Sequence, residues 1–281
     1  MENTFTRRAA LGTALAAVGS SAFGLAPLNS LRPIERPNVS SGLVGGAASV
    51  VRSFSLKGQV SCALMDPETG TVLDAYAPEI ELPPASVTKA LTAAYGMQKL
   101  GQDFQFITSL SLQGRVTNGA LVGDIILTGS ADPTLHTDDL VNFGKVLQKT
   151  GIRQVKGRLL IVDNGFPYLR EIDNSQLPQA NYNPAIAGVN LNLNRVQFEW
   201  ARQADGGYDL SMSAPGRIYR PQIPSIGMRV EERDAPSYGY RYAQEREQWS
   251  VQRSALGKDG VRWLPARNPR RYAGEAFQVI C

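Results

Sequence analysis

The sequence predicts an α/β fold in which a short N-terminal segment is followed by a longer, β-rich inserted region. Two alternating apolar runs joined by turn residues lie within 58–78, and an amphipathic helix runs from Ser86 to Gly101. Short strands broken by Gly, Pro and Asn then fill most of residues 170–265. With 281 residues, 43% of them hydrophobic, the chain is long enough for one large domain or two smaller ones.

The first 28 residues have the pattern of an export signal. Arg7 and Arg8 precede a small-residue apolar stretch that ends at Pro27, too diluted for a membrane-spanning helix. The arginine pair resembles a twin-arginine signal; a general secretory signal with two arginines is the alternative. We therefore expect residues 1–28 to be a removable signal, residues 29–50 to be a flexible linker, and the protein to be periplasmic.

The folded elements are expected to begin near residue 50. The turn formers Asp66–Gly70 join two alternating runs, which predicts a β-hairpin in which Cys62 is a small buried residue. The helix after it repeats apolar residues at the spacing of one packed face. These residues are Val87, Ala90, Leu91, Ala94 and Met97.

The rest of the chain is predicted in the same way. Alternating segments with Gly turns cover 107–135, a helix with Gly151 as its stop signal starts near residue 137, and 155–165 holds another strand. Asn268 and Pro269 suit the N-cap and first position of a final helix.

Two segments of the β-rich region are less regular. Residues 242–249 carry the one helical pattern there, and Asn190, Asn192 and Asn194 alternate with apolar residues as in a strand with a polar face. The Asn side chains are a secondary candidate for substrate contact.

Composition excludes several classes of function. The net charge of +4 is spread along the chain without a Lys/Arg block, so we expect no nucleic-acid partner. One His and the two distant cysteines, Cys62 and Cys281, do not form a zinc site, and no Gly-rich phosphate loop occurs. We expect no metal and no cofactor.

Ser86 and Lys89 form the candidate catalytic pair. A serine needs a neighbouring base, and a lysine three residues further along a helix lies on the same face. The single histidine, His136, would complete a Ser-His-Asp triad only if the fold brought it to a serine, and there is no G-x-S-x-G motif. Ser86 could instead simply cap the helix after Pro84, and the residues alone leave both readings open.

Several motifs in series resemble the class C low-molecular-mass penicillin-binding proteins. They are "PASVTK", "LTGSADPTL", "LQKTGIRQVKGRLLIVD" and "YNPAIAGVNLNLNRVQF". These proteins are D-alanyl-D-alanine carboxypeptidases and endopeptidases of the serine-type transpeptidase superfamily. The resemblance implies a penicillin-recognising (β-lactamase/transpeptidase-like) α/β fold, of which this chain holds only the N-terminal part, with β-rich domains inserted after the S-x-x-K helix.

The resemblance also implies a division of the chain and a site. Residues 51–105 correspond to the N-terminal part of the transpeptidase-like domain, 106–265 to the inserted β-rich domains, and 266–281 to the start of a helix that returns to the catalytic domain. Ser86 corresponds to the acylated nucleophile and Lys89 to the general base. The implied substrates are peptidoglycan stem peptides, and β-lactams would be covalent inhibitors.

The chain departs from the family pattern at two motifs. It contains no S-x-N, and its K-T-G at Lys149 closes a predicted helix, where the family has a strand. We therefore predict that this chain alone is inactive and poorly folded. A β-lactamase, which lacks the long insert, and an inactive or wall-binding homologue are the alternatives. Asp132, in "GSADPTL", resembles a family motif, but Asp-Pro also favours a turn, which we prefer.

Overall fold

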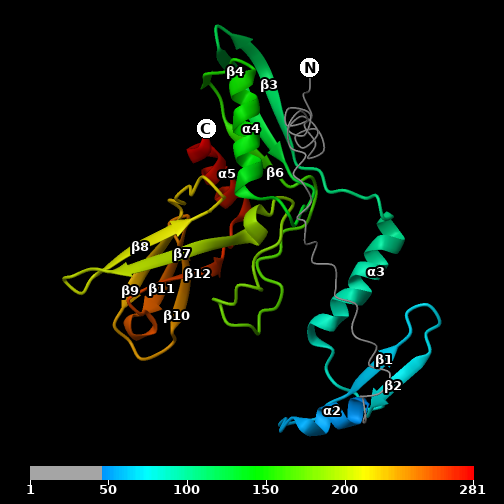
Figure 1. The fold of residues 1–281 in the computed structure, drawn as a ribbon. Helices are drawn as coiled ribbons and strands as arrows, with labels where there is room; N and C mark the ends of the chain where they lie inside the picture. Colours follow the sequence, from blue (N-terminus) through cyan, green and yellow to red (C-terminus); the bar gives the residue numbers. More distant parts are fainter. Residues whose placement is uncertain (1–45) are drawn as a thin grey trace, which may run out of the picture. The chain divides into compact units, whose positions relative to one another are not determined.

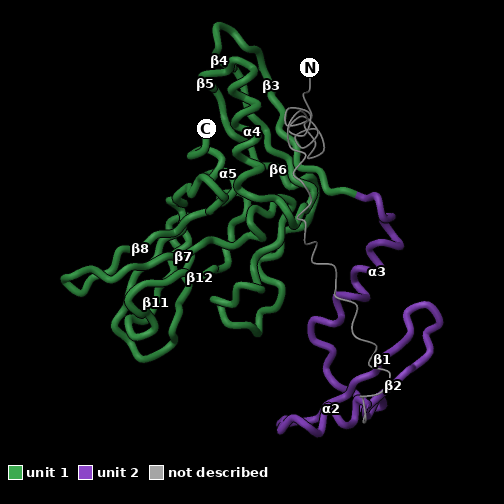
Figure 2. Tube along the Cα trace, viewed as in Figure 1, with its two compact units in different colours: residues 1–20, 105–281 green, residues 21–104 purple. Residues whose placement is uncertain are grey.

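The computed structural model describes residues 46–281, which divide into two compact units (Figure 2). Unit 2 is described from residue 46 to 104 and unit 1 from residue 105 to 281. The predicted export signal, residues 1–28, lies outside the described residues, as does most of the predicted linker. No helix in the described range has the length and apolar character needed to cross a membrane.

Unit 2 contains the predicted hairpin and the predicted helix. Its elements are α2 (Ala47–Ser53), β1 (Cys62–Met65), β2 (Val72–Tyr76), the 3-10 turn η1 (Ala85–Val87) and α3 (Thr88–Leu100). The strands pair antiparallel. The Asp66 carboxylate closes the turn between them by accepting the N–H groups of Glu68 and Thr69 at 2.8 and 2.9 Å. The hairpin and the end of α3 at Gly101 are confirmed.

The start of unit 2 corrects the predicted linker. Residues 47–50 belong to α2, so the linker prediction of 29–50 is wrong at its C-terminal end. The Asp74 carboxylate of β2 accepts a hydrogen bond from the Ala47 N–H at 2.5 Å, at the first turn of α2. The first N–H groups of a helix have no partner within the helix, and here a side chain 27 positions away accepts one of them. The composition of the segment does not reveal this contact.

Unit 2 has no buried residue among those described, 46–104. Cys62 is exposed, so its prediction as a core residue is wrong for this structure. The apolar face of α3 is also open: Val87, Leu91 and Met97 are 74%, 73% and 61% exposed. The periodicity predicted the helix correctly, but no described element covers the face it defines.

Unit 1 begins with a mixed sheet covered by two helices (Figure 1). Its elements are β3 (Ser109–Thr117), β4 (Ala120–Thr128), α4 (Thr137–Lys149), β5 (Gln154–Val155), β6 (Leu159–Val162) and, from the far end of the chain, α5 (Pro269–Ile280). β3 and β4 pair antiparallel, whereas β5 and β6 both run parallel to β4. The caps predicted for α5 are confirmed, since the Asn268 side chain accepts from the Arg271 N–H and proline occupies the first turn.

Two three-stranded sheets form the rest of unit 1. One has the order β12-β7-β8 and the other β10-β11-β9. The strands are β7 (Arg195–Arg202), β8 (Tyr208–Ser213), β9 (Ile226–Glu231), β10 (Tyr238–Ala243), β11 (Arg246–Gln252) and β12 (Asp259–Pro265), with the 3-10 turns η2 (Leu191–Asn194) and η3 (Arg253–Ala255). The strand-rich character predicted for this region is present. Phe198, Trp249, Tyr272 and Phe277 are among the largest fully buried side chains, so α5 shares one core with the sheets.

The segment around Asn192 is not the predicted strand. Asn192, Leu193 and Asn194 have φ values of 50°, 59° and 50°, in the left-handed region that asparagine tolerates better than most residues. The Asn192 side chain bonds the backbone N–H and the hydroxyl of Thr137, at 3.2 and 2.9 Å. The asparagines alternate with apolar residues here because their side chains make hydrogen bonds within the fold. The backbone is a turn and not a pleated strand.

Residues 242–249 are not helical either. They form the end of β10, a two-residue turn and most of β11, and Gln244 and Glu245 in the turn have φ values of 53° and 57°. Cross-strand pairing and the burial of Glu247 and Trp249 outweigh the helix propensity of Gln, Glu and Arg.

Gly129 provides a stability test of unit 1. A Cβ at this position would lie 2.2 Å from the Gly188 carbonyl oxygen and 2.6 Å from Val189 Cγ2. We expect Gly129→Ala to lower the free energy of unfolding by about 1–3 kcal/mol, because backbone atoms must move to admit the methyl group. Gly227→Ala, whose Cβ would meet nothing within 4 Å, is the matched control and should change it by less than about 0.5 kcal/mol. Urea denaturation followed by tryptophan fluorescence measures both; equal midpoints would contradict the prediction.

Candidate functional site

Ser86 and Lys89 lie together at the start of the helix in unit 2. Ser86 is in the middle of η1 and Lys89 is the second residue of α3. Lys89 Nζ donates a hydrogen bond to Ser86 Oγ at 3.0 Å. The spacing of three residues therefore places the amine within proton-transfer distance of the hydroxyl, as the sequence predicted.

The local backbone leaves the Ser86 hydroxyl available. Neither η1 nor α3 has a side-chain cap, so the reading of Ser86 as a helix cap is wrong. Ala85, just before it, has φ of 45°, and the Val87 N–H bonds the Pro84 carbonyl at 2.9 Å. Within the described chain, no backbone carbonyl accepts a hydrogen bond from the Ser86 N–H, which can therefore serve a developing negative charge.

Activation of a serine by a lysine needs both a hydrogen bond between the two groups and an environment that favours the neutral amine. Ser86 and Lys89 have the hydrogen bond. A lysine accepts a proton only when burial or a second cation favours its neutral form. Ser86 and Lys89 are both exposed in the described structure. The hydroxyl and the amine lie within hydrogen-bonding distance, whereas both side chains are open to solvent in the described structure.

The other polar candidates have structural roles. His136 is the N-cap of α4, where its side chain accepts from the Asp138 N–H. Asp132 Oδ1 accepts the N–H and hydroxyl of Thr134 at 2.8 and 2.7 Å, which is the turn that we preferred. Lys149 is the last residue of α4, so K-T-G closes a helix here.

The three asparagines also act within the fold. Asn190 Oδ1 accepts from the Ala187 N–H and from Asn194 Nδ2, and all three side chains are buried. Their hydrogen bonds join η2 to α4 and to the preceding loop, which argues against substrate contact. Among the described residues, no three His, Cys, Asp or Glu side chains cluster as a metal site.

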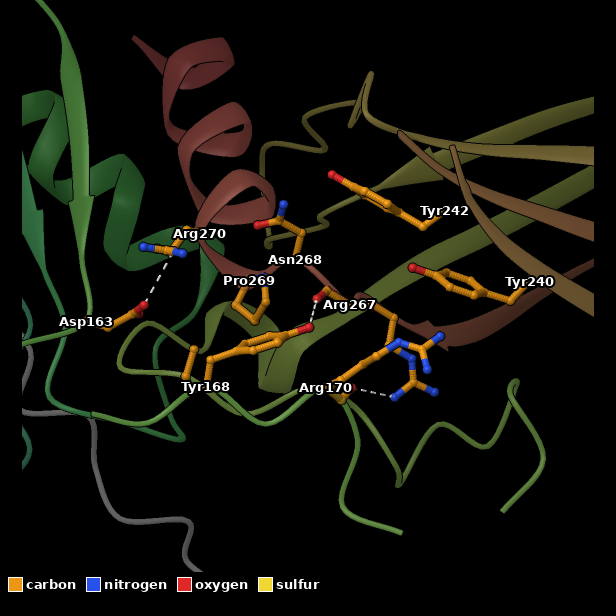
Figure 3. Close-up of a pocket in the computed structure, with 10 residues that line it drawn as sticks. Asp163, Tyr168, Arg170, Tyr240, Tyr242, Arg267, Asn268, Pro269 and Arg270 are labelled. Carbon is orange, nitrogen blue, oxygen red and sulfur yellow. Dashed lines mark hydrogen bonds and ion pairs between the residues drawn. The ribbon is translucent and has the colours of Figure 1, made fainter. Parts of the chain in front are cut away.

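A cavity of about 330 Å³ in unit 1 was not predicted from the sequence (Figure 3). It is lined by side chains from the loop after β6, from β10 and from the start of α5: Asp163, Tyr168, Arg170, Ala187, Tyr240, Tyr242, Arg267, Asn268, Pro269 and Arg270. The elements come together only through the tertiary fold, so no spacing in the sequence indicates the site.

Buried Arg267 organises the floor of this cavity. Its side chain is 4% exposed and donates to the carbonyls of Arg170, Asn183 and Pro178 at 2.9, 2.7 and 3.1 Å. The carboxylate of Glu247 accepts the Arg267 N–H at 2.9 Å. One arginine thus fixes the loop that follows β6 against the start of α5.

Burial sets the ionisation of the groups around Arg267. It raises the pKa of the Glu247 carboxyl, although the N–H groups of Arg267 and Asn268 act in the opposite direction. Burial, and secondarily the charge of Glu247, raise the pKa of the Tyr240 hydroxyl, which therefore stays a neutral donor. Burial lowers the pKa of the Arg267 guanidinium.

Comparison with known proteins gives consistent matches. The model of the D-Ala-D-Ala carboxypeptidase 3 (S13) family matches residues 47–233. A D-alanyl-D-alanine carboxypeptidase of Actinomadura sp. (strain R39) is 32% identical over 126 residues, 44% of this chain and 23% of that protein. D-alanyl-D-alanine carboxypeptidase DacB of Haemophilus influenzae is 35% identical over 145 residues, 50% of this chain and 28% of that protein.

Solved structures show the same fold. Penicillin binding protein 4 (dacB) from Haemophilus influenzae superposes with a TM-score of 0.56 at 23% identity, covering 76% of this chain and 48% of that one. Its complex with a novel β-lactam gives a TM-score of 0.50 at 22% identity, covering 77% and 47%. The chain therefore has a penicillin-binding-protein fold with mixed sheets, and it spans about half the length of these solved relatives.

Proposed function

Because the chain belongs to the D-Ala-D-Ala carboxypeptidase 3 (S13) family, we propose that it supplies the nucleophile and base of a serine-type D-alanyl-D-alanine carboxypeptidase. The observation that supports the proposal most directly is the 3.0 Å hydrogen bond from Lys89 Nζ to Ser86 Oγ. The substrates would be the stem peptides of peptidoglycan, and cross-links between stems would be cut by the same chemistry as an endopeptidase reaction. We also propose export to the periplasm, on the pattern of residues 1–28.

The reaction would proceed through an acyl-enzyme on Ser86. Ser86 Oγ attacks the carbonyl carbon of the penultimate D-alanine while Lys89 takes the hydroxyl proton. The C–N bond to the terminal D-alanine then breaks, and its nitrogen receives a proton as it leaves. Water hydrolyses the ester and restores Ser86. The Ser86 N–H is suited to be one donor to the oxyanion.

The direct test compares two reactions of one protein preparation. The DNA downstream of codon 281 should first be read for a continuing frame that encodes S-x-N and K-T-G, and the product of such a frame is the protein to assay. We expect D-alanine release from a D-Ala-D-Ala peptide together with slow turnover of penicillin. Fast penicillin turnover without D-alanine release would identify a β-lactamase, and neither reaction would identify an inactive or wall-binding homologue.

The 281-residue chain by itself should react poorly. S-x-N is absent from its sequence and K-T-G closes α4, so the motifs to which the family resemblance assigns the second oxyanion donor and the substrate-carboxylate site do not supply them here. Loss of one such donor alone slows acylation about 100-fold or more. Where a frame continues past codon 281 and supplies S-x-N and K-T-G, we expect a fluorescent penicillin to label the 281-residue chain at least about 100-fold more slowly than the product of that frame. Equal rates for the two proteins would overturn this prediction.

A further inference from the structure

The cavity beside β10 combines aromatic rings with charged side chains, and the proposed acylation does not use it. Tyr168 and Tyr242 are 52% and 53% exposed, and Tyr240 is half-buried. Aromatic rings of this exposure next to polar groups are typical of sites for small organic ligands. The volume of about 330 Å³ lies at the lower end of the range for such sites, roughly 300–1,000 Å³.

The aromatic walls are held in place before any ligand binds. Tyr240 and Tyr242 are two residues apart on β10 and so lie on the same face of its sheet. Figure 3 shows Tyr168 across the cavity from them. The Tyr168 hydroxyl donates to the Arg267 carbonyl at 2.8 Å, and the Arg170 guanidinium lies over the Tyr240 ring at 5.6 Å. Tyr168 and Tyr240 are therefore fixed in position, and the exposed ring of Tyr242 offers an open face to a ligand, whereas Arg170 covers one face of Tyr240.

The rim carries charges of both signs. Arg270 Nε lies 3.4 Å from Asp163 Oδ2, and an Arg170 guanidinium nitrogen lies 3.2 Å from Glu171 Oε1. The two arginine side chains are 63% and 57% exposed, so most of their donors face solvent. The lining itself holds three arginines, Arg170, Arg267 and Arg270, against one carboxylate, Asp163. This arrangement suits a ligand that carries hydroxyl groups together with a carboxylate along its edge.

We propose that this cavity binds a saccharide ring of the peptidoglycan glycan strand. The C–H face of a pyranose is apolar and matches the tyrosine rings, while its hydroxyls match the Arg and Asp side chains at the rim. The inference rests on the proposed function, which supplies peptidoglycan as the polymer. It adds that unit 1 holds the carbohydrate part of the substrate, whereas Ser86 in unit 2 acts on the peptide part.

The test is glycan binding by the 281-residue chain, whose unit 1 contains both the cavity and a buried hydrophobic core. The probe is peptide-free glycan strands, released from cell walls by an amidase, and the measurement is isothermal titration calorimetry. Tyr242→Ala should weaken binding about tenfold, because one stacking face is lost. Tyr242→Phe keeps the ring and should bind within about threefold of the parent chain. Tyr219→Ala, similarly exposed at 49% in unit 1 but outside this cavity, is the matched control and should leave affinity unchanged.

Three results would overturn the inference. They are no binding of peptide-free strands at millimolar sugar, an unchanged affinity of Tyr242→Ala, and binding only of strands that still carry stem peptides. Tryptophan fluorescence of each variant shows whether unit 1 remains folded. Glycan binding without D-alanine release in the enzymatic assay would refute the proposed function and support this inference. D-alanine release without glycan binding would support the proposed function and refute this inference.

Discussion

Replacing Ser86 by alanine is expected to abolish covalent labelling of the protein by a fluorescent penicillin. The acyl-enzyme needs the Ser86 oxygen, and the alanine variant removes it while leaving η1 and α3 intact. Labelled peptide should disappear from the segment around residue 86 on mass spectrometry. Persistent labelling of Ser86→Ala would show that another residue is the nucleophile.

Lys89→Ala should slow acylation by about 10²–10⁴-fold, the usual contribution of a positioned base. Lys89→Arg should not restore the rate, because a guanidinium stays protonated and cannot take the serine proton. Lys99→Ala is the matched control on the same helix, since its side chain lies over Tyr95 and makes no contact with Ser86. An acylation rate of Lys89→Ala within error of the rate of Lys99→Ala would contradict the role of Lys89.

Arg267→Ala is expected to have the largest effect on stability, a loss of about 3–5 kcal/mol from unit 1. Its side chain donates to three loop carbonyls and lies 3.8 Å from the Glu171 carboxylate. The truncation removes the donor from one buried carbonyl, that of Asn183, and from two partly buried ones. All three tryptophans, Trp200, Trp249 and Trp263, belong to unit 1, so tryptophan fluorescence during urea unfolding reports on this unit.

Two control variants are needed to interpret the stability of Arg267→Ala. Arg217→Ala, in which the replaced side chain is 92% exposed, should change the free energy of unfolding by less than about 0.5 kcal/mol. Arg267→Lys keeps a charge but not the forked donor geometry, and should fall between the parent and Arg267→Ala. A midpoint for Arg267→Ala within error of Arg217→Ala would exclude the organising role of Arg267.

The sequence predicted the elements that local signals define. The turn residues Asp66–Gly70 specified the hairpin, the apolar period specified α3, and Asn268 with Pro269 specified the start of α5. The family resemblance is confirmed by the match over residues 47–233. Such signals depend on a few neighbouring residues, so they survive without knowledge of the tertiary fold.

The errors arose where distant contacts decide the structure. Asn192 adopts a left-handed conformation because its side chain bonds Thr137, 55 residues away. Glu247 lies in a strand because it is buried against the start of α5, where it accepts the Arg267 N–H. Cys62 alternates with apolar residues, yet no described element covers it. Periodicity reports which residues share a face and does not report what packs on that face.

One candidate site could be predicted from local sequence and the other could not. Ser86 and Lys89 could be found because three residues of helix bring them together. The cavity at Tyr168, Tyr240 and Arg270 could not, because its lining comes from three separate parts of the chain. Only the fold places those side chains side by side.

The hydrogen bond between Lys89 and Ser86 has a consequence for how this architecture could have arisen. Both residues lie on a single helical turn, so their alignment depends on no side chain after Leu100. Genetic insertion of a large module directly after Gly101 would leave the spacing of the two groups unchanged. Because Ser86 and Lys89 lie in one short segment, the pair can be inherited together while other domains are inserted into or deleted from the same gene.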